Sequence, residues 1–364
     1  MKVSSNQIFN FNAGPAMLPS SVMQTAQEEF LNYKNSGMSV MEMSHRGGLF
    51  QEILDKALVN IRKLLQIPES YEVIFCSGGA TAQFSSIPLN LLDENDSAAY
   101  ALTGVWSVKA YQEAKKFYPR VVSIFDGKEG NFSEIPNLKD SDIPSHAKYV
   151  YITSNNTIYG TRYSQFPNLK IPLVADMTSD ILSRELDVSK FGVIFAGAQK
   201  NIGPSGLNIC IIRKDLLQNR KSPIPVILDW QVTAKAGSLY NTPPTYSIYM
   251  AGLVFDWLLN IGGLSAIEKI NEKKAEILYE TLDESEFYQT FVPKANRSKM
   301  NVVFHLKDTN LDSKFVEESE SYGLIGLKGY RDVGGMRASI YNAMPLEGVE
   351  SLVHFLKDFE KKWG

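Results

Sequence analysis

The stretch Ile194-Phe195-Ala196-Gly197-Ala198-Gln199-Lys200-Asn201-Ile202-Gly203-Pro204-Ser205-Gly206 decides the fold and the chemistry expected of this chain. Its apolar start is typical of a buried strand, and its glycine-rich end is typical of a tight turn. Burying a lysine is costly because its ammonium must lose water. Lys200 therefore has two interpretations. The commoner is a surface lysine whose stem packs on the turn; the other is an amine that forms a Schiff base with a carbonyl.

Short apolar runs with strand character recur on both sides of this stretch. Together with 193–196, the predicted strands are 72–76, 98–103, 121–125, 148–153, 172–176 and 207–213. Helical or loop segments such as 105–117 separate several of them and are long enough for crossover connections. Continuous apolar strands that alternate with helices predict an α/β fold, with a mostly parallel sheet covered by helices on both faces.

The chain has 364 residues, which is more than one core usually supports. Helices are predicted from Ser21 to near Gly37, where Gln24 would close a capping box, and at 50–65, 246–260 and 264–282. Beyond them the pattern changes to strands at 300–306 and 336–341 and helices at 312–322 and 346–361. We expect a large domain of residues 16–262 and a small α+β domain of residues 1–15 and 263–364.

Composition excludes several classes of protein. Net charge is −3, so no global field favours nucleic acid or an anionic membrane. The two cysteines, Cys76 and Cys210, lie in apolar runs and are expected to be buried free thiols in a reducing compartment. Residues 1–7 hold no apolar signal core, and no run approaches the length of a membrane span. These observations favour a cytoplasmic enzyme or binding protein.

Asp176 ends the predicted strand 172–176, 24 residues before Lys200. A single aspartate at a strand end more often caps the next helix. In a parallel sheet, however, both residues would lie on the rim where ligands bind. A strand-end lysine and a strand-end carboxylate are the two groups that pyridoxal phosphate requires most, since one holds its aldehyde and the other keeps its ring nitrogen protonated.

Three further features fit this cofactor, although each is weak alone. Ser77-Gly78-Gly79-Ala80-Thr81 follows a strand and opens a helix, and free N–H groups at a helix start bind phosphate. Trp106 follows another strand end, where an indole could stack on a flat ring or simply pack a helix. Arginines at Arg46, Arg331 and Arg337 lie near glycine turns and suit an anionic substrate, or form surface ion pairs.

Together the motifs resemble the phosphoserine aminotransferase family of class V, fold-type I pyridoxal-phosphate enzymes. The resemblance spans residue 9 to the C-terminus. It rests on motifs in one order: Phe11-Asn12-Ala13-Gly14-Pro15-Ala16, His45-Arg46, Gly78-Gly79-Ala80-Thr81-Ala82-Gln83-Phe84, Gln199-Lys200-Asn201-Ile202-Gly203-Pro204-Ser205-Gly206 and Met336-Arg337-Ala338-Ser339-Ile340-Tyr341-Asn342-Ala343.

The resemblance implies transamination between glutamate and 3-phosphohydroxypyruvate, giving 2-oxoglutarate and phosphoserine, in a homodimer with shared active sites. It puts the Schiff base on Lys200 and the ring-nitrogen partner on Asp176. The other cofactor contacts would be Ala80, Thr81, Trp106, Thr157 and Gln199, completed by Asn241 and Thr242 of the second chain. Arg337 would bind the substrate α-carboxylate. His45, Arg46 and Arg331 would bind the distal anion of the substrate, which is either a phosphate or the glutamate side chain. No metal is implied.

Two positions depart from part of the family, since some members carry arginine in place of Thr81 and histidine in place of Tyr330. Several other functions stay open. A serine- or alanine-type aminotransferase would need fewer distal cations. A cysteine desulfurase would need a reactive cysteine on an exposed loop. A Rossmann oxidoreductase would need the missing G-x-G-x-x-G fingerprint, and a non-catalytic binding module would take up no cofactor.

Overall fold

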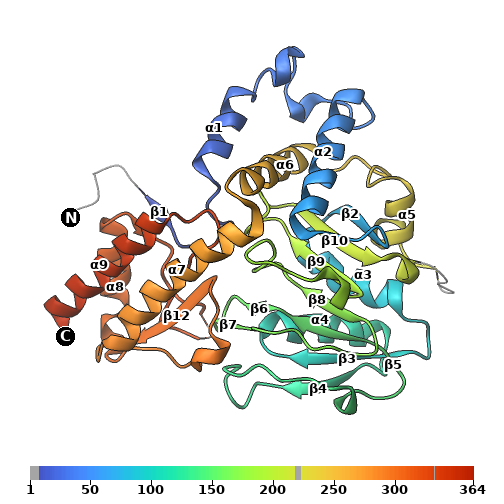
Figure 1. Cartoon of the computed structure of the whole chain (residues 1–364). Coiled ribbons are helices and arrows are strands. Elements are labelled where there is room, and N and C mark those ends of the chain that lie inside the picture. Colours follow the sequence, from blue (N-terminus) through green and yellow to red (C-terminus); the bar gives the residue numbers. More distant parts are fainter. Residues whose placement is uncertain (1–7, 218–222, 332) are drawn as a thin grey trace.

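The structure of the chain is a computed structural model that describes residues 8–217, 223–331 and 333–364. The prediction made for residues 1–7 lies outside this range. Figure 1 shows a larger part built on a central sheet and a smaller part in which helices surround strand β12. Helix α7 (Gly263–Glu284) runs from the one to the other.

The central sheet is mostly parallel, as predicted. Its seven strands lie in the order β2 (Tyr71–Ser77), β10 (Leu207–Arg213), β9 (Val193–Gly197), β8 (Leu173–Asp176), β5 (Ala147–Thr153), β3 (Ser97–Leu102) and β4 (Val122–Asp126). Among the described strands of this central sheet, only β10 is antiparallel to its neighbours. It follows β9 through a short turn, and a short connection can only return the chain antiparallel. The α/β fold class is confirmed.

Alternate side chains of the strands enter two different cores. Val150 and Ile152 of β5 pack on one face of the sheet, and Tyr149 and Tyr151 pack on the other. Helices α2 (Gly48–Leu65) and α6 (Thr245–Asn260) cover the first face. Helices α3 (Gly79–Leu91), α4 (Val105–Phe117) and α5 (Trp230–Lys235) cover the second. Because both faces are buried, the strands are apolar throughout rather than alternating.

The smaller part has its own core. Strands β11 (Tyr288–Gln289), β12 (Asn301–Leu306) and β14 (Met336–Ser339) form an antiparallel sheet. It packs with α8 (Asp312–Ser321), α9 (Leu346–Trp363) and the second half of α7. The segment β1 (Phe9–Asn10) pairs with β13 (Leu324–Ile325), and Phe9 and Phe11 enter the same core. The division into domains at residue 262 stays a prediction.

The predicted helix from Ser21 to Gly37 is wrong. Helix α1 covers only Ser20–Glu28, its N-cap is Pro19, and no capping box forms there. A compact loop replaces the second half of the predicted helix, because Asn32 Oδ1 accepts the Gly37 N–H at 2.8 Å and the Tyr33 N–H bonds the Met38 carbonyl at 3.0 Å. Side chains that satisfy nearby backbone groups in this way compete with helix formation.

The two cysteines are unpaired, as predicted, but only Cys210 is fully buried. Cys76 is half-buried near the end of β2. Burial raises the pKa of the Cys210 thiol well above its usual range.

Within the described ranges no single helix is long and apolar enough to cross a membrane; α6 and α7 would meet that test only together, across a bend of 84°.

Candidate active site

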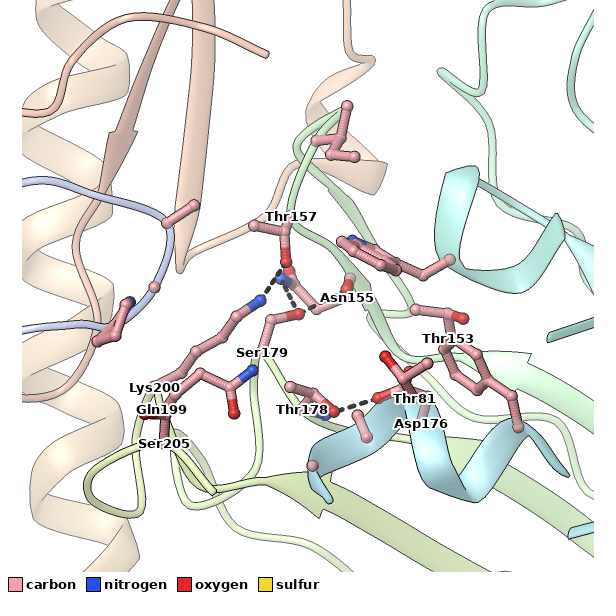
Figure 2. Close-up of a pocket in the computed structure, with 18 of the residues that line it drawn as sticks. Thr81, Thr153, Asn155, Thr157, Asp176, Thr178, Ser179, Gln199, Lys200 and Ser205 are labelled. Atoms are coloured by element: carbon pink, nitrogen blue, oxygen red, sulfur yellow. Dashed lines mark hydrogen bonds between the residues drawn. The ribbon is translucent and has the colours of Figure 1, made fainter. Parts of the chain in front are cut away.

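A cavity of about 610 Å³ lies beyond the carboxyl ends of the parallel strands (Figure 2). Strands β2, β5, β8 and β9 all end at this edge, so the turns that follow them supply its walls. Its lining includes Gly78, Gly79, Ala80, Thr81, Trp106, Thr153, Asn155, Thr157, Asp176, Thr178, Ser179, Gln199, Lys200, Ser205, Tyr330 and Arg337. The structure thus brings together the lysine, carboxylate, glycine turn and tryptophan that were expected from separate motifs.

Lys200 projects into the cavity from the turn that follows β9. Its Nζ donates a hydrogen bond of 2.6 Å to Oγ1 of Thr157, which is buried in the turn directly after the short strand β6 (Asn155–Asn156). The same Nζ lies 5.8 Å from the centre of the Tyr341 ring. The surface-lysine interpretation is therefore wrong for Lys200: its side chain is half-buried, and its amine faces polar groups rather than bulk water.

Asp176 lies at the end of β8, between Thr153 of β5 and Phe195 of β9. Its side chain is 5% exposed, and Oδ1 accepts the Thr178 N–H at 2.9 Å. Burial raises the pKa of this carboxyl, and the bonds from Thr178 and the charge of Lys200 oppose the rise. A buried carboxylate in a cavity wall stabilises a cation that enters the cavity.

The start of α3 lines the cavity where the phosphate site was expected, and its role in binding phosphate stays a prediction. Gly78 and Gly79 have φ of 95° and 64°, which side chains other than glycine seldom adopt. No side chain caps the helix, so its first N–H groups face the cavity near Ala80 and Thr81. Free N–H groups at the positive end of a helix dipole bind phosphate.

Two further residues shape the walls. Trp106, half-buried at the start of α4, presents its indole to the cavity, and Lys109 lies 4.6 Å from the ring centre. Gln199 folds its side-chain amide over Gly197, where a Cβ atom would lie 2.5 Å from Gln199 Oε1. A side chain at position 197 would therefore displace the Gln199 amide from its present position beside the cavity.

Arg337 lies on β14 of the smaller part and faces the cavity beside Tyr330. Its Nε is buried and has no hydrogen-bond partner in the described part of the chain. Burial lowers the pKa of this guanidinium. An unpaired, partly desolvated guanidinium is a strong site for a carboxylate.

Five of the predicted site residues do not line this cavity. His45 and Arg46 lie in the turn before α2, which projects from the top of the larger part (Figure 1). Arg331 is exposed next to Tyr330, and Asn241 and Thr242 are exposed before α6. Within one chain the expected distal cations are thus separated from Lys200, and their assignment stays a prediction.

Some lining residues had no predicted role. Asn155 and Ser179 follow β5 and β8 and bond each other at 2.9 Å through Asn155 Nδ2. Polar residues directly after a strand end were a usable signal for both. Ala13 and Gly14 also line the cavity, although they lie nearly 190 residues before Lys200 in the chain. No local pattern predicts that contact.

No group of three or more His, Cys, Asp or Glu side chains is placed to hold a metal ion among residues 8–217, 223–331 and 333–364.

Comparison with known proteins agrees with this geometry. The aminotransferase class-V family matches residues 8–352. The chain belongs to the class-V aminotransferases, in the family of the phosphoserine aminotransferases. A phosphoserine aminotransferase of Leptospira biflexa is 56% identical and covers 100% of both chains. The solved phosphoserine aminotransferase of Bacillus circulans subsp. alkalophilus superposes with a TM-score of 0.96 at 43% identity, covering 99% of this chain and 100% of that one.

A third relative bears on the cofactor. The pyridoxal-phosphate-bound phosphoserine aminotransferase of Trichomonas vaginalis is 39% identical, with a TM-score of 0.90 over 96% of this chain and 100% of that one. The cavity of our aminotransferase fits that group by its donor set: an amine at Lys200, a buried carboxylate at Asp176, an indole at Trp106 and the free N–H groups of α3.

Proposed function

We propose that this aminotransferase moves the amino group between glutamate and 3-phosphohydroxypyruvate, giving 2-oxoglutarate and O-phosphoserine for serine biosynthesis. One observation carries the proposal: Lys200 and the unpaired Arg337 face the same cavity, with Asp176 buried in its wall. An amino acid held by its α-carboxylate at Arg337 would place its Cα near the Lys200 amine.

Pyridoxal phosphate supplies an aldehyde that captures the amino group and a ring that accepts electrons from the substrate Cα. Ala80, Thr81 and Gln199 would hold its phosphate, and Trp106 would cover its ring. Every other task falls to side chains of the chain itself. The amine of Lys200 would take the proton from the substrate Cα as a general base and, as a general acid, deliver it to the former aldehyde carbon of the cofactor.

Asp176 supports this proton transfer through its charge. Its carboxylate would pair with the ring nitrogen and keep a proton on that atom while negative charge develops. Thr157 accepts a hydrogen bond from the free amine of Lys200, so it would hold this amine at the side of the cavity once the substrate has released it from the cofactor. Both side chains are buried, which keeps water from competing for these contacts.

The distal anion of the substrate needs cations that one chain does not bring to its own cavity. We assign this task to Arg331, together with His45 and Arg46 that a second copy in a homodimer would supply. Asn241 and Thr242 of that copy would complete the set of residues that bind the cofactor phosphate. Exposed apolar side chains are available for such an interface: Met23, Phe30, Leu31, Met41, Ile227 and Tyr240.

A coupled assay tests the function directly. Phosphoserine, serine and alanine are offered as amino donors to 2-oxoglutarate, and the rates are compared at equal concentrations. A strong preference for phosphoserine supports the proposal, and a preference for serine or alanine overturns it. Loss of a visible absorption band on borohydride reduction would identify the aldehyde cofactor bound to a lysine.

The alternatives differ in features that the structure describes. A desulfurase would need an exposed reactive thiol, whereas Cys210 is buried in β10 and Cys76 is half-buried in β2. A serine- or alanine-type aminotransferase has no use for Arg46 and Arg331, so it is the rival that the assay addresses. Two additions belong to the proposal: a cytoplasmic location, supported by two free thiols, and activity on 4-phosphohydroxy-threonine in pyridoxine biosynthesis.

A further inference from the structure

Lys274 of α7 is a buried cation that the reaction does not use. Its side chain is 0% exposed, and no carboxylate of the described residues pairs with it. Its Nζ donates instead to three backbone carbonyls, those of Ile340 at 3.0 Å, Tyr341 at 2.8 Å and Met344 at 3.0 Å. An ammonium has three N–H groups, so all of them are satisfied by this one turn.

Stability alone does not explain this arrangement. A charge without a counter-ion is costly to bury, and apolar replacement of buried charges is often neutral or stabilising. Burial is the single cause that lowers the pKa of Lys274, to about 7; no ionisable group contributes. What Lys274 supplies is geometry, because it draws three carbonyls of residues 340–344 toward one point and fixes the turn after β14.

The turn carries Tyr341, which lies between the smaller part and the cavity. The Tyr341 hydroxyl donates to the Ala13 carbonyl at 2.8 Å and accepts from Asn301 Nδ2 at 3.0 Å. Ala13 lines the cavity, and the Tyr341 ring centre lies 5.8 Å from Lys200 Nζ. Movement of the turn would therefore move a wall of the active site.

The turn also carries Asn342, which is hydrogen-bonded to the turn that contains Lys200. The Asn342 N–H donates to Oδ1 of Asn201, the residue after Lys200, at 3.0 Å. Its side-chain amide donates to the Leu182 carbonyl at 2.8 Å, and Asn271 Nδ2 donates to its Oδ1 at 2.8 Å. All of these groups are buried, so each bond would be costly to leave unmade.

We propose that Lys274 is a positioning residue for the transamination. By holding the turn 340–344, it sets Tyr341 and Asn342 against the turn that contains Lys200. It also keeps Arg337, which lies on the strand just before this turn, in register with Lys200. The inference rests on the proposed function, because it assigns the substrate carboxylate to Arg337. Its effect should therefore appear in substrate binding and proton transfer, and not only in the stability of the fold.

The test uses the holoenzyme with Lys274→Met, which keeps an unbranched side chain one atom shorter and removes its donors. We expect KM for glutamate to rise and kcat to fall, with kcat/KM reduced about tenfold or more. Hydrogen–deuterium exchange should quicken in peptides covering 340–344 and 198–203. The matched control is Lys273→Met on the same helix, since Lys273 is exposed and, within the described residues, its ion pair is with Glu276 at 3.5 Å. It should match wild type in every measurement.

A second control separates positioning from stability. Leu92→Ala, in the core around Tyr149 and Tyr151, should lower the melting temperature; this core contains no residue of 340–344 or 198–203, so the variant should leave KM and the two exchange rates unchanged at 25 °C. Wild-type KM, kcat and exchange in Lys274→Met would overturn the inference. If the wild-type enzyme itself does not use phosphoserine, the proposed function fails instead, while the exchange result still decides the role of Lys274.

A third variant covers the case in which Lys274→Met does not fold. Asn342→Ser removes the side-chain amide that bonds Leu182 and Asn271 and keeps the backbone of the turn. A folded Asn342→Ser enzyme with reduced kcat/KM and faster exchange in 198–203 supports the positioning role. A folded Asn342→Ser enzyme with wild-type kinetics and exchange shows that the turn does not govern the Lys200 site and overturns it.

Discussion

Lys200 Nζ donates a hydrogen bond of 2.6 Å to the hydroxyl oxygen of Thr157, and this bond joins the turn after β9 to the turn after the short strand β6 (Asn155–Asn156). Lys200 is the proposed base, so its resting position is set by Thr157. Replacing Thr157 with valine keeps the shape of the side chain and removes the acceptor. Because a bond to a charged group contributes about 1.5–3 kcal/mol, we expect kcat/KM to fall about tenfold or more.

Steady-state kinetics with glutamate and phosphoserine measure this effect. Thr157→Ser keeps a hydroxyl at the same position and is the matched control, with kcat/KM within about threefold of wild type. Equal losses in the valine and serine variants would show that the methyl group of Thr157 matters rather than the hydrogen bond.

Lys200→Ala removes the only group to which we assign proton transfer. We expect turnover to fall to the background rate, while pyridoxal phosphate still binds through the N–H groups at the start of α3. Activity assays and equilibrium dialysis of the cofactor measure the two effects separately. Turnover close to that of wild type would remove Lys200 from the mechanism.

Much of the site followed from the sequence because it depends on strand ends. Asp176 and Lys200 each directly follow an apolar run, and parallel strands bring such ends to one edge of a sheet. The strands themselves were recognisable because burial on both faces makes them apolar throughout, as the two cores around Tyr149 and Val150 show.

Other features depend on contacts between distant segments or on local side-chain bonds. Ala13 is held at the cavity by Tyr341, which bonds its carbonyl, and by the pairing of β1 with β13. The loop after α1 forms because Asn32 bonds the Gly37 N–H, a bond that no helical periodicity predicts. The positions of His45 and Arg46, away from their own cavity, depend on how this loop projects.

Asp176→Asn should lose activity and gain stability. The amide cannot stabilise a protonated ring nitrogen, so we expect kcat to fall about 10²- to 10³-fold. Burial raises the folded-state pKa of Asp176 above 3.8, so ionisation costs stability once the pH exceeds that folded value. The cofactor-free variant should therefore unfold at higher urea concentration than wild type at pH 7, and the gain should shrink as the pH falls toward 4.

Asp187→Asn provides the contrast for Asp176. Asp187 is exposed, and its pKa is lowered by hydrogen bonds from Ser189, so its ionised form is favoured in the folded state. Neutralising it should cause no gain in stability at pH 7. If Asp176→Asn also gains none, the buried carboxylate of Asp176 carries no cost in the folded protein.

Arg46 should act in the cavity of the second chain, because it does not line its own. Arg46→Ala and Lys200→Ala should each lose most activity as homodimers. After the two proteins are mixed, unfolded and refolded together, half of the dimers would be mixed and would hold one intact site, so activity should return to about a quarter of wild type. No recovery above the separate homodimers would place Arg46 and Lys200 in the same chain's site, or show that the dimer does not form.

Lys274 should make the stability of the protein depend on pH. Its folded-state pKa is about 7, whereas the unfolded chain keeps the proton up to about 10.5. Between these values the unfolded state binds more protons, so the free energy of unfolding rises with pH, by at most about 1.4 kcal/mol per unit for this one group. Urea unfolding at pH 7 and pH 9 should show this rise in wild type and in Lys273→Met but not in Lys274→Met. Equal slopes in all three proteins would mean that Lys274 keeps its charge, and that the bonds to Ile340, Tyr341 and Met344 outweigh its burial.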